Sequence, residues 1–113
     1  MNIGSLYQVK KYFWLLFPTK EIISNSEAVG VGAGAVGEAK VLRGVDATER
    51  EAGNVAAWYS RKYNCNVTYF SHDTFVVCLE EDGKFKKVLT SEGLIGWTWF
   101  GERYNECFEE VKP

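Results

Sequence analysis

The sequence has few of the residues that build disulfide frameworks, metal sites and membrane spans. It contains two prolines, one histidine and three cysteines, which are Cys65, Cys78 and Cys107. An odd number of widely spaced cysteines predicts neither a disulfide framework nor a zinc site. No apolar run approaches the roughly 20 residues that a membrane-spanning helix needs. We therefore expect a soluble cytoplasmic protein with reduced thiols, no bound metal and no membrane partner.

The chain also lacks a strong excess of either charge. It has 13 basic and 15 acidic residues and a formal net charge of -2. Phosphate backbones are bound by clustered positive charge, so a nearly neutral domain is not expected to bind nucleic acid. Lys84, Lys86 and Lys87 lie around Phe85 and are typical of a solvated strand face. They leave single-stranded nucleic-acid binding as an alternative function.

Aromatic residues, in contrast, are abundant. Four Trp, six Tyr and seven Phe make up 15% of a chain of 113 residues, and 46% of the chain is hydrophobic. This length predicts a single domain over residues 1–113. Aromatic side chains favour the half-buried surface of a pleated sheet. The composition therefore favours a mainly β protein of the α+β type.

The N-terminal third predicts one long strand and then a loop. Residues 4–17 form the strand, and Pro18 ends it because proline cannot donate to a ladder. Residues 19–45 are rich in glycine and alanine and predict a flexible loop. We expect Tyr7, Val9, Phe13, Leu15 and Phe17 on one face of the strand and Tyr12, Trp14 and Leu16 on the other.

Residues 46–63 predict a helix. Asp46 and Glu49 have the spacing of a capping box, with Asp46 as the N-cap. Asn64 is suited to the left-handed conformation that ends many helices. Apolar side chains recur at helical spacing and predict one buried stripe, which consists of Ala52, Val55, Ala56, Tyr59 and Tyr63.

The rest of the chain predicts antiparallel strands. Asp82 and Gly83 indicate a tight hairpin turn. Such a turn would pair Glu81 with Lys84 and Val77 with Val88. The apolar run from Phe75 to Leu79 predicts a strand that is covered on both faces. The expected strands span residues 66–70, 75–79, 84–90, 94–100 and 107–111.

The end of the chain resembles the end of SH3 domains. The resemblance rests on Gly93-Leu94-Ile95-Gly96-Trp97, followed by Tyr104 and Phe108-Glu109-Glu110-Val111. The order of elements is also similar: a first strand, a long loop, three strands joined by tight turns and a final strand. The resemblance implies a small SH3-like barrel with the helix and the Gly-rich loop inserted after its first strand. The Ala-Leu-Tyr-Asp-Tyr motif, the paired tryptophans and the proline of the polyproline groove are absent, so that activity is not implied.

A glycine tract carries the one motif with enzymatic associations. Residues 32–37 match G-x-G-x-x-G, which leaves a nucleotide-binding enzyme as an alternative. A dinucleotide site needs a strand before the tract and a helix after it, and Gly44 interrupts the place of that helix. His72 lies in a predicted turn and Cys78 in an apolar run, so they predict no catalytic pair. We expect no catalytic residue and no cofactor.

The aromatic residues near the ends of the predicted barrel are the candidate site. The SH3 resemblance implies that they line a rim that meets an extended peptide, although packing in the core is the competing interpretation. The leading hypothesis is a non-enzymatic module that engages a protein or peptide partner through this rim. The rim consists of Tyr7, Trp97, Trp99, Phe100 and Tyr104.

Overall fold

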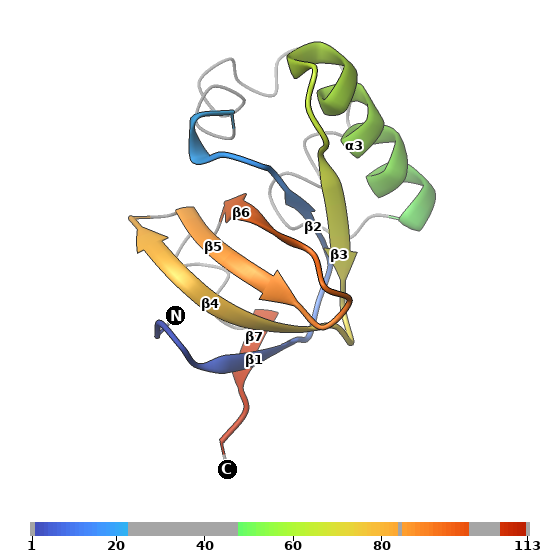
Figure 1. The fold of residues 1–113 in the computed structure, drawn as a ribbon. Coiled ribbons are helices and arrows are strands. Elements are labelled where there is room, and N and C mark those ends of the chain that lie inside the picture. The colour runs from blue at the N-terminus through green and yellow to red at the C-terminus, as the bar shows by residue number, and fades with distance from the viewer. Residues whose placement is uncertain (1, 23–47, 84, 100–106, 113) are drawn as a thin grey trace.

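The protein is mainly β with one long helix (Figure 1). The computed structural model describes residues 2–22, 48–83, 85–99 and 107–112. Most of the predicted loop 19–45, with the glycine tract 32–37, therefore lies outside the described residues. The described strands are β1 (Leu6–Val9), β2 (Phe13–Leu16), β3 (Thr68–Ser71), β4 (Phe75–Asp82), β5 (Phe85–Thr90), β6 (Ile95–Trp99) and β7 (Phe108–Glu110), and the long helix is α3 (Glu49–Tyr63).

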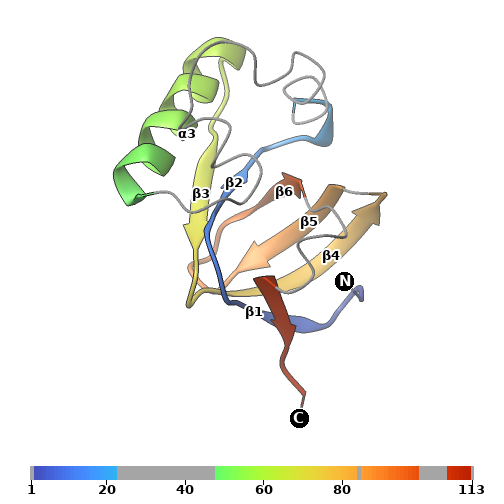
Figure 2. The same cartoon turned by 180° about the vertical axis from the view of Figure 1, so that it is seen from behind.

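The strands form two antiparallel sheets. The larger sheet has five strands in the order β6-β5-β4-β1-β7, and the smaller one pairs β2 with β3. The view from behind shows α3 lying along the smaller sheet, away from the larger one (Figure 2). The larger sheet is not closed on itself. Two strong backbone hydrogen bonds between Phe17 and Trp97, of 2.8 and 2.7 Å, join the end of β2 to β6.

The single first strand predicted over residues 4–17 is wrong, because two strands take its place. Tyr12 has a positive φ of 71°, and the Trp14 indole N–H donates to the carbonyl of Lys11 at 2.8 Å. The chain turns here from the larger sheet into the smaller one. The break also changes which residues face inward: Tyr7 in β1 and Trp14 in β2 are buried in the same cluster. Strict alternation along an unbroken strand would have placed them on opposite faces.

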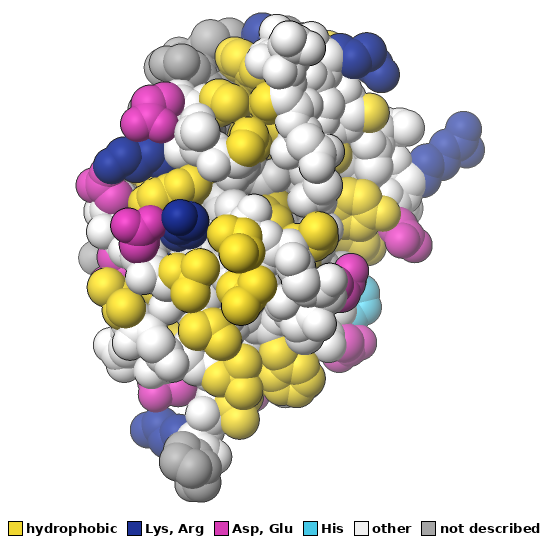
Figure 3. Space-filling model, in the orientation of Figure 1, with side chains coloured by type: hydrophobic (Ala, Val, Ile, Leu, Met, Phe, Trp, Pro, Cys, Tyr) yellow, Lys and Arg dark blue, Asp and Glu magenta, His cyan; other side chains and the backbone are white. Residues whose placement is uncertain are grey.

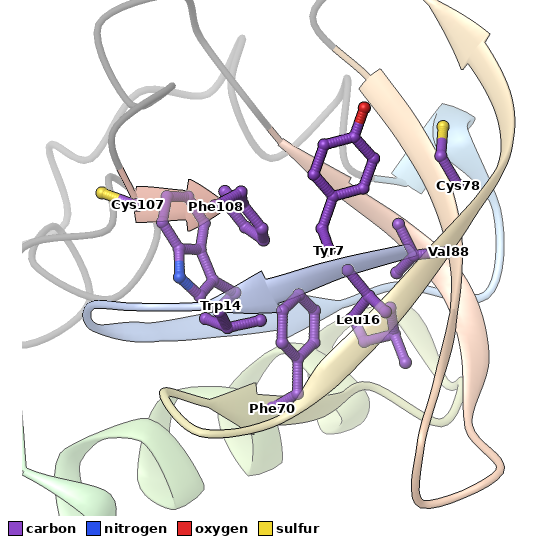
Figure 4. Packing of buried hydrophobic residues seen from close by; sticks show 10 residues of the cluster. Tyr7, Trp14, Leu16, Phe70, Cys78, Val88, Cys107 and Phe108 are labelled. Atoms are coloured by element: carbon purple, nitrogen blue, oxygen red, sulfur yellow. The ribbon is translucent and has the colours of Figure 1, made fainter. Parts of the chain in front are cut away.

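Two apolar clusters hold the sheets and the helix together. The inner core takes side chains from both sheets, and Trp14 is fully buried in it with its ring 4.9 Å from that of Phe108 (Figure 4). The second cluster lies under α3, where the rings of Phe17 and Tyr59 meet edge to face at 5.4 Å. The buried members of the inner core are Tyr7, Val9, Trp14, Leu16, Phe70, Val76, Cys78, Val88, Cys107 and Phe108.

Helix α3 confirms four of the five residues of the predicted stripe and corrects the predicted cap. Ala52, Val55, Ala56 and Tyr59 are buried, whereas Tyr63 is half-buried. Asn64 has the predicted left-handed conformation, with φ 49° and ψ 53°. The N-cap is Thr48 and not Asp46, since the helix begins at Glu49 and the backbone N–H of Glu51 donates to the Thr48 hydroxyl at 3.1 Å. The Glu51 carboxylate in turn accepts from the Thr48 backbone N–H, which completes a capping box.

The β4–β5 hairpin exists, but its register differs from the prediction. Asp82 pairs with Phe85, so the two-residue turn is 83–84 and not 82–83. Gly83 has a φ of 59°, the left-handed conformation that such a turn requires at its first central position. A bulge between Cys78 and Glu80 shifts the register once more. The predicted pairs of Glu81 with Lys84 and of Val77 with Val88 are therefore wrong. The later turn pairs Glu81 with Lys86, and the later turn and the bulge together pair Val77 with Leu89.

Candidate functional site

The structure places the predicted rim residues in different parts of the molecule. Tyr7 in β1 is 6% exposed, and its hydroxyl accepts a hydrogen bond of 2.6 Å from the backbone N–H of Asn2. Its ring belongs to the inner core. Strands β4 and β5 lie between β1 and the strand that carries Trp97. The two rings that the structure describes are therefore not brought together.

The other rim residues are described only in part. The backbone of Trp99 is the last residue of β6, while Phe100 and Tyr104 lie outside the described residues. Trp97 is half-buried, and the Lys20 ammonium lies 5.7 Å from the centroid of its ring. Lys20 also forms an ion pair of 2.7 Å with Asp82, and this hydrogen bond and charge raise the pKa of the lysine. Trp97 thus already has a cation over part of its ring.

The larger sheet instead presents a row of aliphatic side chains that crosses four of its strands and continues beside the fifth. Leu6 pairs with Val77, Val77 pairs with Leu89, and Leu89 pairs with Ile95. Val111 extends the row just beyond β7, where its backbone N–H donates to the carbonyl of Leu6 at 2.8 Å. Paired residues of neighbouring strands share a face. These five side chains therefore lie in line on one side of the sheet.

Most of this side of the sheet faces solvent, while Phe85 and Trp97 at one end of it pack against the second cluster. Successive strand residues point to opposite faces, and the residues between the row members, such as Val76 and Val88, are fully buried in the inner core. The exposed fraction is 58% for Ile95, 40% for Val111 and 37% for Leu6. Phe75 lies beside the row and is 37% exposed. We call this surface the outer apolar face and define it as Leu6, Phe75, Val77, Leu89, Ile95 and Val111.

The space-filling view shows the same concentration of apolar atoms. Hydrophobic side chains gather over the middle and lower part of the face on which β4 and β5 lie (Figure 3). The prediction that the run from Phe75 to Leu79 is covered on both faces is wrong. One side packs into the inner core, whereas Phe75 on the other side is exposed.

The charges beside the outer apolar face are paired with one another. Lys87 lies 3.3 Å from Glu80 across the β4–β5 hairpin, and Lys10 lies 3.6 Å from Glu109. Lys86 is 8% exposed, pairs with Glu81 at 3.3 Å and donates to the backbone carbonyl of a turn residue. The described lysines of the cluster proposed for nucleic-acid binding therefore each have an acidic partner. Lys84, its third lysine, lies outside the described residues.

The candidate nucleophiles and ligands do not form a catalytic group. Cys78 is fully buried, and this burial raises the pKa of its thiol. Burial also raises the pKa of the half-buried Cys65. The one histidine, His72, is exposed at a turn with Asp73 at 3.9 Å. Within the described parts of the chain, no group of three His, Cys, Asp or Glu side chains could hold a metal ion.

The outer apolar face was not predicted, because it depends on register. Its members come from four strands and from the residue after β7, and apart from Leu89 and Ile95 those in neighbouring strands are distant in sequence. A one-residue shift in any pairing would turn the side chains of that strand to the other face. The signals in the sequence are the continuous apolar run 75–79 and the alternation in 94–99, and neither distinguishes one face from the other.

Comparisons with known proteins add neither a family nor a function. The chain matches no protein-family model, no curated protein and no solved structure. Among the described residues, no helix has the length and apolar character needed to cross a membrane.

Proposed function

We propose that the protein is a non-enzymatic interaction module that binds a protein partner through its outer apolar face. One observation carries this proposal: aliphatic side chains from four strands and from the residue after β7 lie in register on the solvent side of a sheet. Exposed apolar side chains are common singly, but a continuous patch usually marks an interaction site. The exposed apolar area of the six side chains is on the order of 400 Å², which is within the range of such patches.

The proposed fold is an SH3-like barrel with an insertion. The strand order supports it, since β4, β5 and β6 follow as antiparallel neighbours and the first strand lies between β4 and the last. The backbone bonds between Phe17 and Trp97 support it too, because they join the continuation of the first strand to β6. Strand β3 and α3 then belong to the insertion. This fold does not specify a partner, since a fold by itself carries no function.

The proposed partner surface differs from the aromatic rim expected from the sequence. Tyr7 is enclosed in the inner core, whereas Ile95 and Leu6 are exposed. Trp97 lies on the same side of β6 as Ile95, so it can extend the contact at the margin of the face. All three cysteines are free thiols, which supports action in a reducing compartment such as the cytoplasm.

An affinity purification from the native host tests this function. Ile95→Lys puts a charge at one end of the proposed protein contact, while the exposed position of residue 95 lets the domain keep its fold. Ile3→Lys is the matched control, since Ile3 is 64% exposed and does not belong to the face. We expect at least one protein to be recovered with the wild type and with Ile3→Lys but not with Ile95→Lys. The same proteins recovered with all three baits would contradict the proposal.

A further inference from the structure

The two sheets differ in what covers their outer sides. On the smaller sheet, α3 covers the side of β2 that points away from the inner core, where Tyr59 packs against Phe17. On the larger sheet, the outer apolar face carries side chains of the same kind, but Leu6, Phe75, Ile95 and Val111 are exposed, and Val77 and Leu89 are half-buried. The cluster under α3 reaches only Phe85 and Trp97 on this side of the larger sheet, so the helix does not cover the row itself.

We propose that the outer apolar face is the docking site for an amphipathic helix of a partner protein. This inference rests on the function proposed above and specifies its partner. The helix would present one stripe of uncharged aliphatic side chains to the row from Val111 to Ile95. Strands of a sheet lie about 4.8 Å apart, so a row across five strands is roughly 19 Å long. A helix rises about 1.5 Å per residue, so about 13 residues span the row.

A helix suits this surface better than an extended peptide does. The side-chain face of a sheet offers no backbone donors or acceptors, and the backbone groups of an extended peptide need partners when they are buried. A helix satisfies its own backbone groups within its length. It can therefore bury an apolar stripe against Val77 and Leu89 without leaving backbone groups unpaired.

The size of the face favours a single helix over a stable dimer of two identical chains. A specific and stable interface buries about 800 Å² of total surface on each partner. The apolar side chains of the face offer about half of this area, so a dimer would also have to bury the ion pairs Lys87–Glu80 and Lys10–Glu109 beside the row. A single helix makes a contact of this smaller size, and such contacts are typical of transient partners.

The charges around the face indicate that the helix needs no net charge. Glu80 is neutralised by Lys87 on one side of the row, and Glu109 by Lys10 on the other. No strong field of one sign is left to attract a charged partner through these residues. Binding should therefore depend on apolar contact and only weakly on salt.

Selection from a phage-displayed library of 16-residue helical peptides tests the inference with the full chain as bait. The supporting result is a set of peptides with aliphatic residues at positions i, i+3 or i+4, and i+7. A synthetic peptide from this set should bind Ile95→Lys about tenfold more weakly than the wild type, because the buried contact of one large aliphatic side chain is lost. Its affinity for Ile3→Lys should equal that for the wild type, and salt should change it less than twofold.

Val111→Lys provides a second variant if Ile95→Lys does not fold, since Val111 lies beyond the end of β7 and is 40% exposed. Selected peptides without helical spacing, or peptides that bind the lysine variants as well as the wild type, would overturn the inference. A dimer of the free chain that Ile95→Lys dissociates would also overturn it, although the face would still bind protein. Failure of the proposed function would give a different result, because the host proteins would then bind Ile95→Lys as well as they bind the wild type.

Discussion

Gly96 has no room for a side chain where β6 meets the end of β2. A Cβ atom at this position would lie 2.7 Å from Leu16 Cγ and 2.7 Å from the backbone oxygen of Phe17. Both distances are far below van der Waals contact, and one of the two atoms belongs to the backbone. The same oxygen accepts the hydrogen bond from the N–H of Trp97. Gly96→Ala must therefore push β6 away from the strand that carries Leu16 and Phe17.

The expected effect of Gly96→Ala is a loss of about 3 kcal/mol in the free energy of unfolding. Overpacking of a filled site costs about 1–3 kcal/mol, and each of the two weakened backbone hydrogen bonds contributes about 0.5–1.5 kcal/mol. An unfolding entropy of about 2.1 cal/mol/K per residue converts this loss to a decrease of roughly 12 °C in Tm. Urea unfolding followed by tryptophan fluorescence measures the change, since Trp14 is buried in the inner core.

Gly53→Ala is the matched control in α3. A Cβ atom at Gly53 would meet only the ring of Tyr69, at an ordinary contact distance of 3.8 Å. Alanine is favoured over glycine in a helix by about 1 kcal/mol, so this variant should be more stable than the wild type. Gly96→Ala with unchanged or increased stability would refute the close approach of β6 and β2, and with it the support for a barrel.

The remaining predictions concern the helix cap, an ion pair and the thiols. Thr48→Ala removes the acceptor for the Glu51 N–H and should lower the free energy of unfolding by about 1 kcal/mol, measured by urea titration; an unchanged midpoint would rule out the observed cap. Burial raises the pKa of Glu81, but the hydrogen bond and charge of Lys86 outweigh it and hold the pKa below its usual 4.5. The stability that this ion pair adds should be fully present above pH 4.5 and lost as the pH falls through the lowered pKa of Glu81. The free energy of unfolding of Glu81→Gln should therefore decrease less steeply with falling pH than that of the wild type. An equally steep decrease would contradict this. Alkylation followed by mass spectrometry should label the half-buried Cys65 in the native state and Cys78 only as fast as the protein unfolds; rapid labelling of Cys78 would show that it is not buried.

Local patterns in the sequence predicted the elements that local interactions determine. The stripe from Ala52 to Tyr59 and the left-handed Asn64 are properties of one helix, and both were confirmed. Gly83 likewise marked the β4–β5 hairpin. The position of the N-cap was missed because Asp46 and Thr48 both have an acidic residue three positions later. The spacing of residues in the sequence therefore does not distinguish the two starts.

Features that depend on contacts distant in sequence could not be predicted in this way. No glycine or proline marks the break between the two strands at Tyr12, yet this break places Trp14 in the same core as Tyr7. The outer apolar face requires four strand pairings and a bulge, and none of these is encoded by spacing alone. Ile95 and Tyr7 have similar strand patterns in the sequence, but one is exposed and the other buried.

Site-specific photo-crosslinking in the native host tests most directly whether the outer apolar face binds a partner. A benzophenone amino acid replaces Ile95 in one strain and Ile3 in another, since both side chains are exposed but only Ile95 belongs to the face. Irradiation should give a discrete crosslinked product of higher mass from position 95 and none from position 3. Products of the same kind and yield from both positions, or no product from position 95, would contradict the proposed function.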